Sequence, residues 1–343
     1  MEIKNCPGLL LEGFSEYSPL FLRRMFDGRK VSHILPYNAP EIDEEDQKKF
    51  MQNRKRISIS GVQEKYSVLL EKNNLRLTEE KEQGTYILKP KPHGLQKTAM
   101  APANEHITMQ IANQVYKINT AESGLVFFSN DEPAYITKRF DIGDLGIKLA
   151  KEDFASLAGK TEENAGHNFK YDFSYEGIAE LIKEHVGAWK IEMEKFYNLI
   201  VFNFLFSNGD AHLKNFSLLE TKNGDYVLSP AYDLMDTGIH VEEEGFFALD
   251  NELFKERHWS DCRINNTQHH PCKEDFIYFG KIIGINENRV NKLLGPFLIK
   301  QKHVEVLVKN SFLDNDTKSQ YLNHYNERLT MLLHRTSPIH PND

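Results

Sequence analysis

The chain has 343 residues, 40% hydrophobic and 27% charged, which is typical of a globular protein with a large core. Its formal net charge of −8 argues against an extensive nucleic-acid surface, because contacts to phosphates need clustered Lys and Arg. Three cysteines are too few for a disulfide framework, the charged start MEIKNCPG does not resemble a signal peptide, and no apolar run approaches the roughly twenty residues of a membrane helix. We therefore expect a cytoplasmic protein that does not enter a membrane.

The N-terminal part of the chain predicts a small β-sheet with one helix. Short spans alternate apolar and polar side chains, as half-buried strands do, and Pro90 ends one of them. Apolar residues then recur at helical spacing, with Asn104 as a candidate N-cap. In chain order, the pattern predicts strands over 65–71, 75–80 and 85–90, a helix over 103–116 and a hairpin over 125–141.

After residue 141 the period becomes mainly helical. Ser174 is placed to cap a helix over 174–186, and the almost entirely apolar segment 191–206 predicts a buried helix. Asn223-Gly224 predicts the turn of a hairpin over 216–230. We therefore expect an α+β protein with two lobes. The predicted parts are a short N-terminal segment, 1–56, a β-rich lobe, 57–140, and a helical lobe, 141–343.

The stretch NGDAHLKNF, residues 208–216, follows the buried helix directly and carries several polar groups of different charge. An ordinary helix end with a Gly turn is the simpler interpretation. However, Asn215 follows Asp210 by five residues, and Asp233 stands just beyond the predicted hairpin. This spacing is typical of phosphotransferases, in which the first Asp orients the nucleophile and the Asn and second Asp hold Mg²⁺.

A phosphotransferase also needs a cation for the nucleotide phosphates. Lys89 lies in a predicted strand between apolar neighbours, and Glu105 at the start of the next helix is a candidate partner. An edge lysine that points to solvent is the simpler alternative. Upstream, the small residues Ser58, Ser60 and Gly61 form a candidate phosphate-binding turn, although its single Gly does not match G-x-G-x-x-G.

Seven segments follow one another along the chain: SISGVQEKYSVLL, TYILKP, NEHITMQIA, AYITKRFD, EDFASLAGK, FSNGDAHLKNFSLL and LSPAYDL. In this order they resemble HipA-type serine/threonine kinases, the toxin halves of bacterial toxin–antitoxin modules. The resemblance covers about residues 55–240 and implies a protein-kinase-like fold. The 56 residues before the loop are too few for the complete N-terminal subdomain of the long family members, so the chain resembles the shorter HipT-like form.

The resemblance implies a role for each matching residue. It implies that Asp210 is the catalytic Asp, that Asn215 and Asp233 bind Mg²⁺, and that Lys89 binds the ATP phosphates. It also implies three groups of further site residues. These are His212 and Lys214 near the transferred phosphate; Ser58, Ser60, Gly61 and Val62 in the ATP loop, with Ser58 and Ser60 as autophosphorylation sites; and Lys138 and Phe140 at the adenine.

By the same resemblance we expect a protein substrate such as an aminoacyl-tRNA synthetase, a DNA-binding HipB-like antitoxin, and a small separate protein that supplies the missing subdomain. Two alternatives stay open: a lipid or small-molecule kinase, since GDAHLKN also resembles GDxHxxN loops, and a catalytically silent kinase-like binding subunit. A cluster of His and Cys over 258–272 matches no common zinc spacing, and we interpret it as chance.

Overall fold

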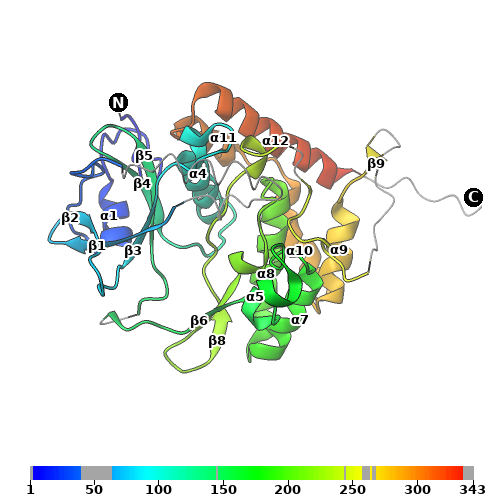
Figure 1. Ribbon diagram of the computed structural model, residues 1–343. Coiled ribbons are helices and arrows are strands. Elements are labelled where there is room, and N and C mark those ends of the chain that lie inside the picture. Colours follow the sequence, from blue (N-terminus) through cyan, green and yellow to red (C-terminus); the bar gives the residue numbers. More distant parts are fainter. Residues whose placement is uncertain are drawn as a thin grey trace, which may run out of the picture. The chain divides into compact units, whose positions relative to one another are not determined.

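The computed structural model describes residues 3–39, 64–143, 146–242, 245–256, 263–264 and 268–334. The chain forms two compact units. The first comprises Met1–Lys148, Tyr232–Glu242 and Lys302–Tyr321, and the second comprises Leu149–Ala231, Glu243–Gln301 and Leu322–Asp343. Both helices and strands are present, which confirms the predicted α+β class (Figure 1). Among the helices of the described ranges, none is long and apolar enough to span a membrane.

A five-stranded sheet in the order β2-β1-β3-β5-β4, with antiparallel neighbours throughout, forms the centre of the first unit. The predicted strands and the hairpin over 125–141 are confirmed. The elements of this unit are α1 (Pro19–Phe26), β1 (Tyr66–Glu71), β2 (Asn74–Leu77), β3 (Tyr86–Lys89), η1 (Thr98–Met100), α4 (Ala101–Gln114), β4 (Ser123–Phe127), β5 (Pro133–Lys138), η4 (Thr237–Ile239), α11 (Lys302–Asn310) and the first turns of α12 (Asn315–Leu333).

Alternation along the strands sends neighbouring side chains to opposite faces of this sheet. Tyr86 and Leu88 join a core cluster with Phe21 of α1 and with other residues of the N-terminal segment. Lys89, one position on, is paired in register with Tyr135 of β5 and lies on the other face. Helix α4 packs on β4 and β5, and Figure 1 shows it beside these strands. The strand period therefore turns Lys89 away from the apolar core.

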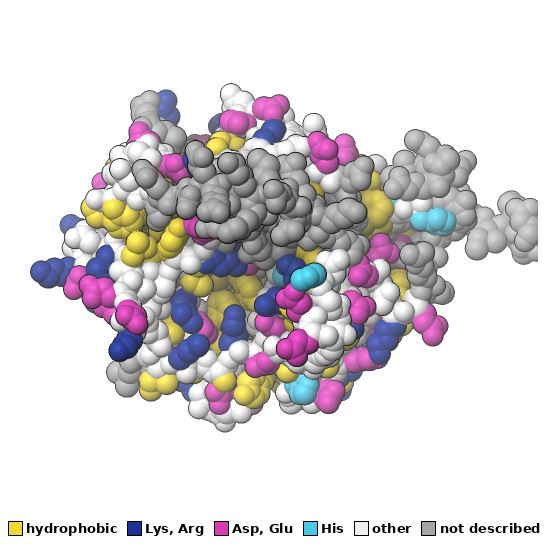
Figure 2. Space-filling view, in the orientation of Figure 1, with side chains coloured by type: hydrophobic (Ala, Val, Ile, Leu, Met, Phe, Trp, Pro, Cys, Tyr) yellow, Lys and Arg dark blue, Asp and Glu magenta, His cyan; other side chains and the backbone are white. Residues whose placement is uncertain are grey.

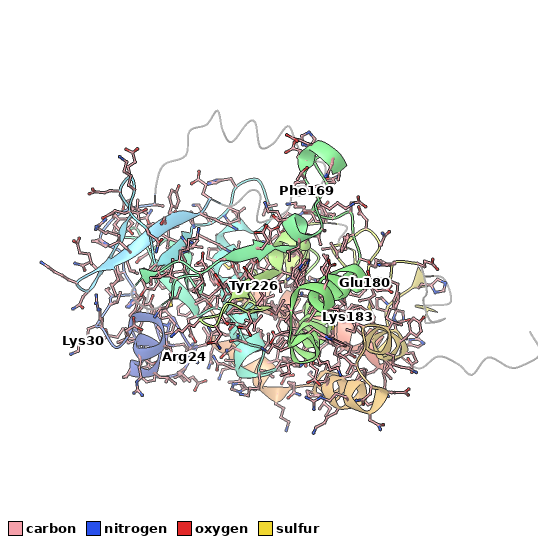
Figure 3. The ribbon with its side chains drawn as sticks, turned by 90° about the horizontal axis from the view of Figure 1, so that it is seen from below. Arg24, Lys30, Phe169, Glu180, Lys183 and Tyr226 are labelled. Carbon is pink, nitrogen blue, oxygen red and sulfur yellow. The ribbon has the colours of Figure 1, made fainter. Side chains whose placement is uncertain are left out.

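The N-terminal segment is an integral part of the first unit. Ser18 caps α1 by accepting a hydrogen bond from the Phe21 N–H. The ring of Phe21 lies so close to Gly124 of β4 that a Cβ at Gly124 would come within 2.5 Å of it. On the same helix, Arg24 (Figure 3) forms an ion pair of 2.7 Å with Glu122, just before β4. Apolar packing and a polar contact thus both hold α1 on the sheet.

Helix α4 begins earlier than predicted. It starts at Ala101, with Pro102 in its first turn, where a missing N–H costs nothing. Asn104 therefore lies inside the helix rather than at its N-cap, and its side chain is completely buried. The N-cap prediction was wrong because the Asn104 amide bonds to a segment far along the chain instead of to its own helix end.

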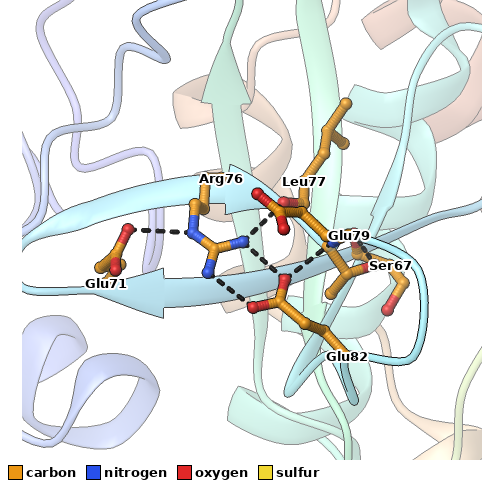
Figure 4. Close-up of polar contacts among 7 residues, drawn as sticks. Ser67, Glu71, Arg76, Leu77, Glu79 and Glu82 are labelled. Atoms are coloured by element: carbon orange, nitrogen blue, oxygen red, sulfur yellow. Dashed lines mark hydrogen bonds and ion pairs between the residues drawn. The ribbon is translucent and has the colours of Figure 1, made fainter.

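The outer strands of the sheet carry an exposed polar cluster around Arg76 of β2 (Figure 4). The guanidinium contacts Glu71 at 2.9 Å and Glu82 at 2.7 Å, and Glu82 also accepts the Glu79 N–H at 2.8 Å. Exposed pairs of this kind each contribute little to stability, but here they tie β2 to the turn that leads into β3.

Lys and Arg side chains are interspersed with Asp and Glu over the face drawn in Figure 2, and neither sign of charge covers that face alone.

The second unit is mainly helical, with a three-stranded sheet β6-β7-β8. The apolar helix α8 is buried along most of its length, and Ser174 caps α7 (marked by Glu180 and Lys183 in Figure 3), both as predicted. The predicted hairpin at Asn223-Gly224 is β7-β8. The elements are β6 (Lys151–Asp153), α5 (Phe154–Leu157), α6 (Glu162–Ala165), α7 (Tyr175–His185), α8 (Trp189–Leu205), η3 (Leu213–Asn215), β7 (Ser217–Glu220), β8 (Tyr226–Leu228), β9 (Arg263–Ile264), β10 (Gln268–His269), α9 (Lys273–Ile282), α10 (Glu287–Leu294), η5 (Gly295–Leu298) and the rest of α12.

Candidate functional site

Lys89 is the centre of a buried charge cluster in the first unit. Its ammonium lies 2.6 Å from the Glu105 carboxylate on α4 and also contacts the Asp233 carboxylate. The side chains of Lys89 and Glu105 are 4% and 3% exposed, and that of Asp233 is 16% exposed. The alternative of an edge lysine facing solvent is excluded, and the pairing with Glu105 is found as predicted.

The two carboxylates that contact the Lys89 ammonium have pKa values shifted in opposite directions. Burial alone disfavours ionisation of Asp233, but Lys89 and Lys65 hold its pKa below the ordinary value. Burial raises the pKa of the deeper Glu105 to about 7, against the opposing effect of Lys89. Burial also works against the charge on Lys89, yet the Asp233 and Glu105 carboxylates together hold its pKa above the ordinary value. The closely paired Asp233 and Lys89 are therefore the charged partners.

Two further contacts of this cluster come from side chains that the sequence analysis did not single out. Lys65 Nζ lies 3.4 Å from Asp233 Oδ2, with the Lys65 side chain 40% exposed. The Lys89 ammonium also lies over the ring of Tyr135, 5.3 Å from its centroid. A lysine at the first position of a predicted strand looks like a surface residue, so no pattern distinguishes Lys65 in advance.

Asp233 has an unusual backbone conformation. Its φ is +57°, in the left-handed region that residues other than Gly, Asn and Asp avoid. Such a conformation persists only where the surrounding contacts hold it, and it is common at functional sites. The ion pairs with Lys89 and Lys65 are two of those contacts.

Asp210 lies in the second unit, in the turn between α8 and η3. Its side chain is buried, and its Oδ1 accepts a hydrogen bond of 2.9 Å from the Tyr171 hydroxyl. Behind the turn, Asn208 Nδ2 donates to Asn203 Oδ1 of α8 at 3.0 Å, and the Tyr175 hydroxyl donates to the Ala211 carbonyl at 2.9 Å. Hydrogen bonds before and after Asp210 thus hold the turn, and together with the Tyr171 hydroxyl they fix the direction of the Asp210 carboxylate.

The same turn holds the other residues of the predicted catalytic loop. His212 is buried, its Nε2 is 3.8 Å from Asp210 Oδ1, and its ring meets that of Tyr171 edge-on at 5.2 Å. Asn215 ends η3 with its N–H bonded to the His212 carbonyl at 2.9 Å, and it is 8% exposed. Lys214 is exposed, with its ammonium 5.9 Å from the centre of the Phe169 ring. Tyr171 was missed because a tyrosine in a polar loop gives no sequence signal.

The remaining predicted site residues divide into two groups. Lys138, at the end of β5, forms an ion pair of 2.9 Å with Asp27, and the ring of Phe140 lies 5.6 Å from that of Tyr232 in the same unit. The predicted ATP-loop residues lie outside the described ranges. They are Ser58, Ser60, Gly61 and Val62.

Within the described ranges, no group of three or more His, Cys, Asp or Glu side chains is placed to hold a metal ion. Of the His and Cys cluster over 258–272, His258 and Cys262 lie outside those ranges. Mg²⁺ does not need such a group, because it is usually bound by one or two carboxylates together with water and phosphate oxygens. Asp233 of the first unit and Asn215 of the second each carry a side-chain oxygen of the kind that Mg²⁺ prefers, and the lowered pKa keeps Asp233 ionised.

Comparisons with known proteins identify a family and two kinase-named relatives. The model of the "HipA-like C-terminal domain" matches residues 57–303. A Haemophilus influenzae protein named "Putative kinase" is 29% identical over 333 residues, covering 94% of each chain. "Putative kinase Y4dM" of Sinorhizobium fredii is 31% identical over 62% of this chain and 53% of its own length.

A solved structure shares the fold. It is described as "Shewanella oneidensis MR-1 Toxin Antitoxin System HipA, HipB and its operator DNA complex". The match has a TM-score of 0.58 at 20% identity and covers 86% of this chain and 72% of that one. At this identity the likeness concerns the fold alone.

Proposed function

This chain belongs to the HipA-like C-terminal domain family, and we propose that it is an ATP- and Mg²⁺-dependent serine/threonine protein kinase that acts as the toxin of a toxin–antitoxin module. The observation that carries the proposal is the buried cluster of Lys89, Glu105 and Asp233. Burying a lysine with two carboxylates often adds nothing to the stability of the fold, because removing the charges from water offsets their mutual attraction. It is, however, the arrangement that a phosphate-binding cation requires.

In the proposed reaction, the oxygen of a substrate hydroxyl attacks the γ-phosphorus of ATP. A new O–P bond forms, the bond from the γ-phosphorus to the bridging oxygen breaks, and ADP leaves with that oxygen. Asp210 orients the attacking hydroxyl and accepts its proton, and the Tyr171 hydrogen bond holds Asp210 in position. Lys89 binds the ATP phosphates once it is released from Asp233.

Asn215 and Asp233 would hold Mg²⁺ through side-chain oxygens. When bound, the ion neutralises negative charge on the phosphates during transfer. His212 and Lys214 are proposed to lie close to the transferred phosphate, where the exposed Lys214 ammonium can contact it. Phe140, already beside the Tyr232 ring, is proposed to pack near adenine, with Lys138 in the same hinge segment.

The proposed substrate is a translation protein such as an aminoacyl-tRNA synthetase. The proposed partners are a DNA-binding HipB-like antitoxin and a small separate protein that resembles the N-terminal subdomain of the long family members. The Shewanella oneidensis structure contains HipA with HipB and operator DNA, which supports an antitoxin partner for this chain. We further propose that the kinase phosphorylates Ser58 and Ser60 in its own ATP loop.

The deciding experiment incubates the protein with ATP and Mg²⁺, with and without purified synthetases, and locates phosphate by mass spectrometry. Phosphate on a Ser or Thr side chain that disappears in Asp210→Asn supports the proposal. Labelling of lipids or small molecules instead would favour the alternative kinase class. Growth arrest on overexpression should likewise require Asp210, whereas arrest that persists in Asp210→Asn points to a binding subunit without catalysis.

A further inference from the structure

Asn104 of α4 holds a distant piece of backbone through its side chain. Its Oδ1 accepts the Asp236 N–H at 3.1 Å, and its Nδ2 donates to the Asp236 carbonyl at 2.7 Å. Both residues belong to the first unit, and Asn104 is 0% exposed. One buried carboxamide thus satisfies both backbone groups of a single residue, which fixes the position and the direction of the chain there.

His240 completes this contact and defines its proton positions. The second Nδ2 hydrogen of Asn104 points to His240 Nε2 at 3.0 Å, and His240 Nδ1 lies 2.9 Å from the Gln96 carbonyl. An amide nitrogen can only donate, so His240 Nε2 accepts. Nδ1 therefore carries the proton and donates a hydrogen bond to the Gln96 carbonyl. The neutral His240 therefore supports Asn104 from behind, and both N–H donors of the Asn104 amide are used, while its oxygen accepts from the Asp236 N–H.

Asp233 lies three residues before Asp236 in the same segment. Asp233 is the residue in the left-handed conformation, with φ of +57°, and its side chain contacts Lys89. Glu105, the neighbour of Asn104, holds the same Lys89. Helix α4 thus holds the segment 233–240 at two points, once through the Lys89 ammonium and once through the Asn104 amide.

We propose that Asn104, supported by His240, is a positioning residue that fixes the segment 233–240 on α4 and so presents the Asp233 carboxylate to a divalent cation. This inference rests on the proposed function for the role of Asp233. The ion pair with Lys89 must open when Asp233 takes up a cation and Lys89 takes up phosphate. The amide contact does not involve either side chain, so it keeps the left-handed backbone of Asp233 in place during that exchange.

The first test uses amide hydrogen exchange and does not depend on any ligand. In Asn104→Ala the Asp236 N–H loses its acceptor, so exchange in the peptide that covers 233–240 should become at least about tenfold faster. The matched control is His106→Ala, two residues along α4 and equally buried, which removes a hydrogen bond of 2.9 Å to the Gly8 carbonyl. The control should leave exchange over 233–240 unchanged. Equal protection in Asn104→Ala and the unsubstituted protein overturns the inference.

The second test measures ATP binding by calorimetry while the Mg²⁺ concentration is varied. Asn104→Ala should need about tenfold more Mg²⁺ for half-maximal binding, with its ATP affinity in EDTA unchanged, as expected when a group behind a metal ligand is lost. His106→Ala should not shift the Mg²⁺ dependence. His240→Gln, whose amide can accept from Asn104 and donate to Gln96, should behave like the unsubstituted protein, whereas His240→Leu should resemble Asn104→Ala.

The two proposals fail in different ways. If the unsubstituted protein binds ATP with a Mg²⁺ dependence that Asn104→Ala shares, the positioning role is wrong and the proposed function stands. If the unsubstituted protein shows no Mg²⁺-dependent binding of ATP, the proposed function is wrong, and with it the assignment of Asp233 as a cation ligand. A merely structural Asn104 would lower thermal stability in the variant without moving the Mg²⁺ dependence.

Discussion

The Lys89 ammonium lies 2.6 Å from the Glu105 carboxylate, and both side chains are almost completely buried. The same ammonium contacts Asp233, so it pairs with two carboxylates in the interior of the first unit, and Asp233 also contacts Lys65. Removing one member of a buried pair leaves uncompensated charge, whereas replacing the whole group with apolar residues does not. This asymmetry makes the cluster a sensitive point for stability as well as for the proposed chemistry.

Lys89→Met should destabilise the fold strongly, because the buried Glu105 then loses its cation and Asp233 keeps only the contact with the partly exposed Lys65. We expect a loss of about 3–5 kcal/mol in the free energy of unfolding, measured by urea denaturation at pH 7. The double variant Lys89→Met/Glu105→Leu should recover part of this loss, because it removes the deeper carboxylate as well. A loss below about 1 kcal/mol in the single variant would show that the cluster is not compensated as described.

Asp210→Asn and Asp233→Asn should both abolish phosphoryl transfer but differ in nucleotide binding. Asp233 is proposed to bind Mg²⁺, so its substitution should weaken ATP binding in the presence of Mg²⁺. Asp210 is proposed to act on the hydroxyl, so Asp210→Asn should keep ATP affinity. Turnover is followed on an identified substrate, affinity by calorimetry and folding by circular dichroism. Normal turnover in both folded variants would refute the catalytic assignment.

Ser58 and Ser60, which lie outside the described residues, alternate with Ile57 and Ile59, so in an extended chain both hydroxyls face one side. Phosphate there adds up to about two negative charges where the ATP phosphates are proposed to bind. The Ser58→Ala/Ser60→Ala variant should keep ATP binding but lose self-inactivation over time. Asp at these positions should weaken ATP affinity less than phosphate does. Equal ATP affinity for phosphorylated and unphosphorylated protein would rule this regulation out.

His106 should make the protein sensitive to acid. Burial lowers its pKa to about 4, against the hydrogen bond to the Gly8 carbonyl, while an unfolded histidine titrates near 6.5. As the pH falls below about 6.5, the unfolded state takes up a proton that the folded state refuses, so stability decreases until the pH reaches about 4. Between pH 7 and 5 this amounts to about 2 kcal/mol.

His106→Gln removes the titrating group and can still donate a hydrogen bond to Gly8. Its free energy of unfolding, measured in urea at pH 7 and pH 5, should therefore fall by about 2 kcal/mol less than that of the unsubstituted protein over the same interval. The neutral, buried His240 contributes in the same direction in both proteins, because burial lowers its pKa as well. An identical decrease in the two proteins would contradict the assignment to His106.

Local patterns predicted the elements on which the site is built, but not the contacts between them. Alternation identified β3 and helical spacing identified α4, so Lys89 and Glu105 could be proposed as partners from their positions alone. The turn after α8 was also predictable, because an apolar helix changes to polar residues at Asn208.

Partners that lie far apart in the chain could not be predicted. Asn104 satisfies the usual rule for an N-cap, yet its amide bonds to Asp236, 132 residues later. Tyr171 similarly reaches Asp210 from a loop 39 residues earlier. No local pattern records such a bond, because either residue would look the same if it faced solvent.

The first unit is built from three separate stretches of the chain, which determines when its contacts can form during synthesis on the ribosome. Its sheet and α4 are complete by residue 148, but the partners Asp233 and Asp236 come later, and Asn310 and Tyr321 bond to Leu10 and Thr108 later still. At about 5–20 residues per second, a ribosome needs on the order of 10–35 seconds to add the 173 residues that lead from Lys148 to Tyr321, the end of the first unit. A nascent chain therefore holds Lys89 and Glu105 for several seconds before Asp233 emerges, so the cluster of Lys89, Glu105 and Asp233 forms only late in synthesis.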